Sequence, residues 1–115
     1  MHEYSLVGAL IERVEAEAAA RGAGRIHRVH VLIGELAGVE IDLFRTAYET
    51  FRERTALADA ELTVRAAEAR WGCPTCGGAI ARGQPLSCPH CSVPARLFQG
   101  DEIMLERIEM EVPDV

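Results

Sequence analysis

The sequence predicts an α+β fold, in which a three-stranded sheet carries two helices on one face and a small cysteine-rich domain is inserted between the last two strands. Two observations predict this fold. Apolar residues recur at helical spacing in two segments, and they alternate as in strands in three others. All four cysteines and four of the five prolines lie within residues 72–100. The predicted main domain is therefore 1–70 with 101–115, and the inserted domain is 71–100.

The first segment, residues 5–21, is predicted to be a helix. Ser5 suits the N-cap position, and Gly22 suits the position just after the last turn. Glutamates and an arginine supply the polar side of the segment. The apolar side repeats every four residues, as expected of a helix that packs on a core; it consists of Leu6, Leu10, Val14 and Ala18, widened by Ala9 and Ile11.

The middle of the chain predicts a strand followed by a second helix. Residues 25–35 alternate apolar and polar side chains and end at a glycine, which is typical of a strand. Residues 39–55 return to helical spacing, with Asp42 as a candidate cap. The strand is expected to bury Val29, Val31 and Ile33, and the helix Leu43, Ala47 and Phe51 with Phe44 and Tyr48 beside them.

Two further strands flank the cysteine-rich insert. Residues 61–71 place Leu62, Val64 and Ala66 on one face, and residues 102–112 do the same with Met104, Ile108, Met110 and Val112. Ile103 and Leu105 fall on the opposite face of the last strand, which indicates a bulge or burial on both sides. Because the insert should leave and return at one end of the sheet, these two strands are expected to be neighbours.

Composition excludes several classes of function. The net charge of −6 argues against a surface that follows nucleic-acid phosphates, because such surfaces need clustered lysine and arginine. No apolar run approaches the roughly 18 residues that span a bilayer, and no secretory signal is visible. We therefore expect a cytoplasmic protein with no membrane partner, in which the cysteines are reduced and metal binding is favoured over a disulfide framework.

The cysteines predict a structural metal site. Cys73, Cys76, Cys88 and Cys91 form the pattern C-x₂-C-x₁₁-C-x₂-C, which is typical of a zinc ribbon. Four thiolates saturate Zn²⁺ and leave no position for water or a substrate, so this site is predicted to hold the insert together. A redox dithiol pair or an iron–sulfur site is the alternative. His90 lies inside the second pair and is interpreted as a solvated turn residue rather than an outer donor or an alternate ligand.

The first three residues offer a different set of donors. The α-amine of Met1, the backbone amide of His2 and the imidazole of His2 can close two fused chelate rings in one plane, with Glu3 as a fourth donor. Planar nitrogen donation suits Ni²⁺ or Cu²⁺ and suits the tetrahedral preference of Zn²⁺ poorly. These residues alone do not decide between a metal site and an ordinary solvated chain end.

The whole pattern resembles the HypA family of nickel metallochaperones, which mature NiFe hydrogenases. The resemblance rests on "MHEYSLV" at the start, "IGELAGVE" after the first strand, the paired cysteines and the final "LERIEME". It implies that His2 is the essential nickel ligand, with Met1 giving its amine and Glu3 its backbone or side chain, and that the four cysteines hold structural zinc. It also implies a HypB-type GTPase and a hydrogenase large-subunit precursor as partners, and it allows a homo-oligomer.

Some positions depart from the family or fit other functions. No histidine directly follows Cys76 or Cys91, so the pH response of the zinc site that some members show is not expected from this chain. His27 and His30 are interpreted as structural or solvated. The alternative function is a zinc-ribbon adaptor for nucleic acid or protein. The sequence shows no nucleophile–base pair, no phosphate-binding glycine loop and no open zinc site, so an enzyme is not predicted.

Overall fold

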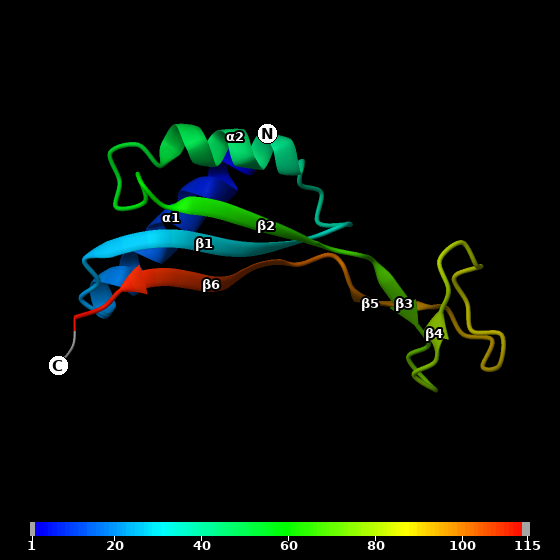
Figure 1. Ribbon diagram of the computed structural model, residues 1–115. Helices are drawn as coiled ribbons and strands as arrows, with labels where there is room; N and C mark the ends of the chain where they lie inside the picture. Colours follow the sequence, from blue (N-terminus) through cyan, green and yellow to red (C-terminus); the bar gives the residue numbers. More distant parts are fainter. Residues whose placement is uncertain (1, 114–115) are drawn as a thin grey trace.

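The computed structural model describes residues 2–113 and shows an elongated α+β molecule built on two sheets (Figure 1). The larger sheet has the strand order β2-β1-β6, and the smaller sheet has the order β4-β3-β5. Within the described part of the chain, no helix is long and apolar enough to cross a membrane. The elements are α1 (Glu3–Ala20), β1 (Arg25–Gly34), α2 (Ile41–Phe51), β2 (Glu61–Ala67), β3 (Arg70–Gly72), β4 (Ala79–Ile80), β5 (Arg96–Gln99) and β6 (Ile103–Glu111).

Helix α1 begins earlier than the sequence suggested. Its N-cap is His2 and not Ser5, and no side chain caps the first turn. Its end agrees with the prediction, because Gly22 adopts a left-handed φ of 64°. There the N–H of Gly22 donates to the carbonyl of Ala19 and the N–H of Ala23 to that of Ala18, as in a Schellman motif. The helix therefore starts directly after the candidate nickel ligand.

The buried stripe of α1 is rotated by one residue from the predicted one. Val7 and Ile11 are buried, whereas Leu6 and Leu10 are half-buried and pack at the side of the core. Val14 and Ala18 are buried as predicted. Apolar residues occupy both neighbouring rows of this helix, so only the contacts with the sheet and with α2 decide which row faces inward.

Helix α2 contributes Phe44, Ala47 and Tyr48 to the same core. The prediction was wrong for Phe51, whose ring is 43% exposed at the end of the helix and meets the ring of Tyr4 edge to face. It was also wrong for Asp42, because the N-cap is Glu40. Tyr48 is fully buried, and its hydroxyl donates to the carbonyl of Ala60 at 2.8 Å. Burial raises the pKa of Tyr48 to about 12.

Strand β1 is the centre of the larger sheet. It pairs with β2 in parallel and with β6 antiparallel, so the two strands that flank the insert are not neighbours in this sheet, contrary to the prediction. Val29, Val31 and Ile33 are buried in the core as expected. Because β1 pairs on both of its edges, it is the central strand of the sheet. Its parallel pairing with β2 requires a crossover connection, which contains α2.

Strand β6 contains the bulge that the sequence indicated. The pairing with β1 shifts between His30 and Val31, so Glu106 is the extra residue on β6. The shift turns Leu105 to the core side together with Ile108 and Met110. Met104 is half exposed, which corrects its predicted position on the buried face.

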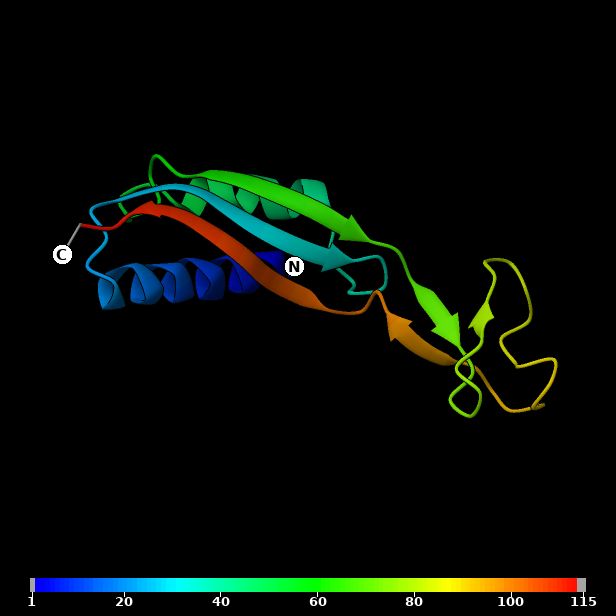
Figure 2. The same cartoon turned by 60° about the horizontal axis from the view of Figure 1, so that its bottom comes forward.

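The strands flanking the insert do meet beyond the end of β1. There the chain passes from β2 into β3 and returns from β5 into β6, and β3 pairs with β5 (Figure 2). Gly34 ends β1 so close to Gly100 that a Cβ on Gly34 would lie 2.3 Å from the carbonyl carbon of Gly100. Gly100 itself has a φ of 115°, a conformation that favours glycine. The junction between the two sheets therefore depends on close backbone contact.

Candidate metal centres

The four cysteines lie on two similar turns that face each other in the small lobe. In the first turn the N–H of Gly77 donates to the carbonyl of Cys73, and in the second the N–H of Ser92 donates to that of Cys88, each at 2.9 Å. Gly77 and Ser92, which close these two turns, both have positive φ. The structure thus brings together all four cysteines that the sequence singled out, with their Sγ atoms within 4.8 Å of one another.

The spacing of the sulfurs suits zinc. Sulfurs placed about 2.3 Å from a zinc ion at the corners of a tetrahedron lie about 3.8 Å apart. The Sγ atoms of Cys76 and Cys88 are separated by 3.8 Å. The donor set is thiolate only and closed, which is the set that structural zinc sites use. Cys73, Cys76, Cys88 and Cys91 are therefore the residues that would hold the ion.

The pKa values of the clustered thiols also favour a bound cation. Backbone N–H groups of Cys76 and Thr75 donate to the Sγ of Cys73 and lower the pKa of its thiol to about 6. In contrast, hydrogen bonding with Cys73 and then with Cys76 raises the pKa of Cys91 to about 12. The first thiolate therefore forms readily, whereas four adjacent thiolates repel one another unless a cation lies between them.

The lobe around the cysteines has almost no core of its own. Within residues 73–99 only Cys73 and Cys88 are buried. Leu86 and Phe98 are both about half exposed. His90 is exposed and is not one of the four residues in the cluster, consistent with its interpretation as a turn residue. Little except the cysteine cluster can hold this segment in one conformation.

The N-terminal candidate site lies at the start of α1, beside the segment that leads from β1 into α2. Met1 lies outside the residues that the structure describes. His2 is exposed and precedes α1, with a φ of −74° and a ψ of −6°. The backbone ladder of the helix begins where the N–H of Leu6 donates to the carbonyl of His2 at 2.9 Å. The amide nitrogen of His2 precedes this ladder, so using it as a ligand costs no helical hydrogen bond.

Glu3 is the only charged side chain that the described part of the chain buries, with 4% of it exposed. Its Oε2 accepts a hydrogen bond of 3.1 Å from the backbone N–H of Glu40, just before α2. The pKa of Glu3 is lowered to about 2. The amino terminus is the largest cause of this shift, and the hydrogen bond from the Glu40 amide is the next. The Glu3 carboxylate is therefore ionised at neutral pH and held against the segment that leads into α2.

Sequence reasoning missed the role of the segment between β1 and α2. Glu35 accepts a hydrogen bond from the backbone N–H of Ala69 at 2.9 Å and forms an ion pair with Arg82 of the small lobe. Glu40 reaches the start of α1 through its backbone. An acidic residue directly after the glycine that ends a strand is a weak signal, and nothing in the sequence pairs it with an arginine far along the chain.

The two strand histidines are not near the cysteine cluster. His27 hydrogen-bonds Glu111 through Nε2 at 3.0 Å, and His30 pairs through Nε2 with Glu109. Both carboxylates belong to β6, so these contacts join the two strands on the surface of the large sheet. Neither histidine is part of a described group of three or more metal-binding side chains.

Comparisons with known proteins place this arrangement in a family. The family model described as "Hydrogenase/urease nickel incorporation, metallochaperone, hypA" matches residues 1–110. A Shewanella halifaxensis protein named hydrogenase maturation factor HypA is 37% identical over 113 residues, which cover 96% of this chain and 98% of that protein. A protein of the same name from Wolinella succinogenes is 36% identical over 117 residues, covering 99% and 98% of the two chains.

Solved structures agree with the sequence comparisons. The solution structure of the Ni metallochaperone HypA from Helicobacter pylori has a TM-score of 0.73 and 33% identity, and it covers 98% of this chain and 100% of its own. A second solution structure, of a HypA protein, has a TM-score of 0.79 and 34% identity, with 96% of each chain covered. The match extends over the large sheet, both helices and the cysteine lobe.

Proposed function

Because the chain belongs to the HypA family of hydrogenase nickel-incorporation metallochaperones, we propose that it takes up Ni²⁺ at Met1, His2 and Glu3 and delivers it for the maturation of a NiFe hydrogenase. The observation that supports this most directly is the position of His2. Its exposed side chain stands at the first residue before α1, beside the buried carboxylate of Glu3. The family and its relatives are named for metal incorporation and maturation rather than for a catalysed reaction.

The proposed site binds nickel as cargo. The amine of Met1 with the amide and imidazole of His2 supplies nitrogen donors, and Glu3 supplies its backbone or its carboxylate. The ionised Glu3 side chain adds negative charge next to the incoming cation. Its hydrogen bond with the Glu40 amide fixes the first turn of α1 against the entry to α2, so the ligands start from a defined position.

Exposure of His2 suits release as well as uptake. A partner can approach the imidazole without first opening the core, and its own ligands can replace the donors one at a time. The proposed recipients are a HypB-type GTPase and the precursor of the hydrogenase large subunit. In this scheme the nickel-binding domain comprises residues 1–70 and 101–115.

The proposed role of zinc is structural. Cys73, Cys76, Cys88 and Cys91 would hold Zn²⁺ in the domain formed by residues 71–100. When bound, the ion supplies four strong bonds to a segment that buries little apolar surface. The closed thiolate set makes this site unsuited to handing a metal on. The adaptor hypothesis for nucleic acid is not favoured by the family match.

Nickel titration of four proteins tests this proposal: the wild type, His2→Ala, a form with extra residues before Met1, and His27→Ala as a matched control. His27 is also an exposed histidine, but it lies on β1. Loss of a direct ligand should exceed the 10–100-fold loss that follows removal of an outer partner, so we expect His2→Ala to weaken nickel binding more than about 100-fold. The extended form should lose tight binding too, and His27→Ala should keep it.

Zinc content measured in the same samples separates the two sites. We expect one zinc per chain in all four proteins, because none of the changes touches a cysteine. Purification tags belong at the C-terminus, away from the amine. Nickel that stays tightly bound in both His2→Ala and the extended form, or that is lost when the cysteines are replaced, would show that the N-terminal assignment is wrong.

A further inference from the structure

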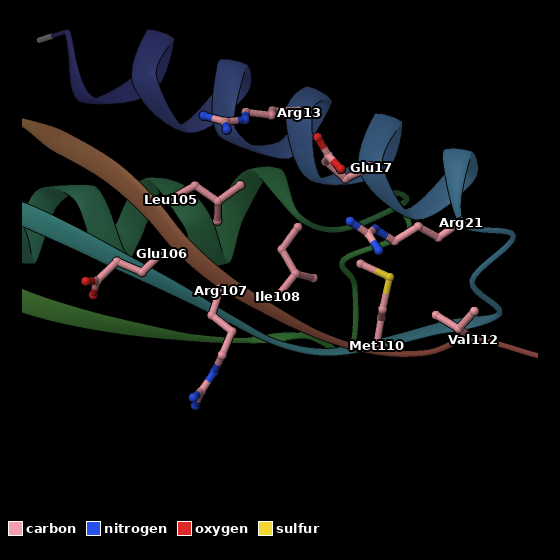
Figure 3. A pocket seen from close by; sticks show the side chains of 9 residues that line it. All are labelled: Arg13, Glu17, Arg21, Leu105, Glu106, Arg107, Ile108, Met110 and Val112. Carbon is pink, nitrogen blue, oxygen red and sulfur yellow. The ribbon is translucent and has the colours of Figure 1, made fainter.

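A groove runs between α1 and β6 on a side of the molecule that the proposed nickel and zinc sites do not use. It has a volume of about 370 Å³, and both elements line it (Figure 3). Its floor is apolar, because Leu105, Ile108 and Met110 point from β6 toward the helix. Val112 continues the floor and is 49% exposed.

The groove borders a free strand edge. Strand β6 ends the order β2-β1-β6, so no strand of the described residues pairs with its outer side. An edge of this kind presents unpaired backbone donors and acceptors, and it can receive an additional strand. The bulge at Glu106 interrupts regular pairing, which leaves the stretch from Arg107 to Val112 as the part suited to such an addition.

Two arginines lie along the helical wall of the groove. Arg13, Glu17 and Arg21 form one row at a spacing of four residues and face β6. Within residues 2–113 neither arginine side chain has an ion pair or hydrogen bond, whereas Arg65 and Arg107 each pair with glutamates. Glu17 lies between the two arginines, so the helical wall of the groove carries one more positive than negative charge in a chain whose net charge is −6.

The spacing of the arginines matches an extended segment. Arg13 and Arg21 are eight residues apart, which corresponds to about 12 Å along a helix. Four residues of a strand cover about 13 Å, and residues four apart in a strand lie on the same face. Two acidic side chains four residues apart would therefore meet both arginines, and an apolar side chain midway between them would lie over the floor.

The charges argue against a second copy of this chain as the occupant. A second β6 added to this edge would carry Leu105, Ile108 and Met110 on one face and Glu106 and Glu109 on the other. The glutamates already pair with Arg65 and His30 on the open face of the sheet. It would not offer two carboxylates on the same face as its apolar residues.

From these observations we propose that β6 and α1 form a docking site for an extended acidic–apolar segment of a partner protein, which adds a strand to the edge of β6. The segment carries acidic residues at positions i and i+4 and an apolar residue at i+2. Backbone pairing supplies the attachment, and the two arginines select the charge pattern. The inference does not depend on the nickel site.

A synthetic peptide tests the proposal on the full chain loaded with zinc. The probe has seven residues, with glutamate at positions two and six, valine at position four and threonine elsewhere. One control peptide carries lysines in place of the glutamates, and a second moves one glutamate to position five, on the opposite face. We expect saturable NMR shifts of the β6 amides, and slower exchange of those on its outer edge, with the first peptide alone.

Charge reversal gives the second arm. We expect the double variant Arg13→Glu with Arg21→Glu to bind the glutamate peptide at least about tenfold more weakly and to bind the lysine peptide instead. Arg45→Glu, an exposed change on α2, is the matched control and should bind as the wild type does. Dispersed amide NMR signals from β1, β2 and β6, as in the wild type, would show that the double variant is folded.

Three results would overturn the proposal. One is the absence of NMR shifts of the β6 amides at millimolar peptide. Another is binding of the glutamate peptide that is as strong in the double variant as in the wild type. The third is a concentration-dependent dimer in sedimentation experiments that the double variant dissolves, because the groove would then serve a second copy of the chain. Nickel binding that fails in the wild type would contradict the proposed function and would leave these outcomes unaffected.

Discussion

The open face of the large sheet carries a network of paired charges. Arg65 of β2 donates through Nε and Nη2 to the two carboxylate oxygens of Glu106 on β6, at 3.2 and 2.7 Å. This fork spans the central strand β1. Its geometry depends on the bulge, because Glu106 is the extra residue that turns outward there. A local irregularity in backbone pairing therefore determines which carboxylate can reach across the sheet.

Removal of the Arg65 guanidinium should be visible in the titration of Glu106. The hydrogen bonds from Arg65 are the largest cause that lowers the pKa of Glu106 below its ordinary value of 4.5. We predict that Arg65→Gln raises this pKa toward 4.5, measured by the carboxyl carbon chemical shift. Arg45→Gln, on α2, is the control and should leave the pKa unchanged.

The pair of Arg65 and Glu106 should also make the stability of the folded chain depend on pH. A carboxyl whose pKa is lower in the folded chain contributes stability that is present above its unfolded pKa and is lost as the pH falls through the folded value. The wild type should therefore exceed Arg65→Gln in stability at pH 7, and the small difference should shrink below about pH 4.5. A difference that stays constant down to pH 3 would contradict this explanation.

Among single residues, those that act through chemistry were easier to predict than those that act through contacts. The cysteines were predictable because two C-x-x-C turns can converge on one ion wherever the rest of the chain goes, and the structure brings them together. Burial of Glu3 was not, because its hydrogen-bond partner is a backbone amide at Glu40 that any residue type would supply. The assignment of nickel to His2 remains a prediction.

At the scale of elements, the strands of the cysteine lobe make few contacts, so under the proposed function the lobe would depend more on its metal than on its strands. Strands β3, β4 and β5 are three, two and four residues long, and the two residue pairs between β3 and β4 are a small contact. Small segments with so few buried side chains do not fold without a cross-link or an ion. The large sheet has its own core from α1, α2 and β1. The two parts should therefore respond differently to removal of zinc.

We predict that a zinc chelator unfolds residues 73–98 and leaves the large sheet folded. Amide NMR signals of the lobe should collapse to unfolded positions, while those of β1, β2 and β6 should keep their dispersion. Return of zinc should restore the lobe signals, which serves as the control for irreversible damage. Lobe signals that stay dispersed in protein shown to contain no metal would contradict a structural role for zinc.

The elements themselves were predicted more reliably than their arrangement. Both helices and the three long strands follow from the spacing of apolar residues, and the bulge in β6 follows from the conflict between Leu105 and Ile108. The order of the strands did not follow, because the positions of β2 and β6 depend on what β1 can pair with. The rotated stripe of α1 has the same origin, since Leu6 and Val7 are both apolar and only tertiary contacts distinguish them.

At the scale of the whole molecule, the chain is much less compact than a single globular domain. Its radius of gyration is 18.2 Å, whereas a compact chain of this length has about 13 Å. The excess comes from the lobe, which extends beyond the end of the large sheet (Figure 2). The chain joins the large sheet to the lobe twice, between β2 and β3 and between β5 and β6, where Gly34 lies against Gly100. Glu35 adds contacts with Ala69 and Arg82.

The ion pair between Glu35 and Arg82 is the contact best placed to set the angle of the lobe. Arg82 lies in the loop after β4, so the pair links the lobe to the end of β1 at a second point beyond the strand crossings. The hydrogen bond from Arg82, followed by that from the Ala69 amide, lowers the pKa of Glu35, which keeps its carboxylate charged at neutral pH. Because both side chains are exposed, salt should weaken the pair.

We therefore predict that Arg82→Gln frees the lobe to reorient without unfolding either part. Residual dipolar couplings of the wild type should fit one alignment tensor for β1, β2, β6 and the lobe, whereas those of the variant should require two. In high salt, the couplings of the wild type should also begin to depart from a single tensor. Arg96→Gln, an exposed change on β5, is the matched control and should keep one tensor. Glu35→Gln should reproduce Arg82→Gln, and the double variant should add nothing, because the two side chains act through one contact. One tensor in Arg82→Gln would mean that the backbone contact of Gly34 with Gly100 sets the angle by itself.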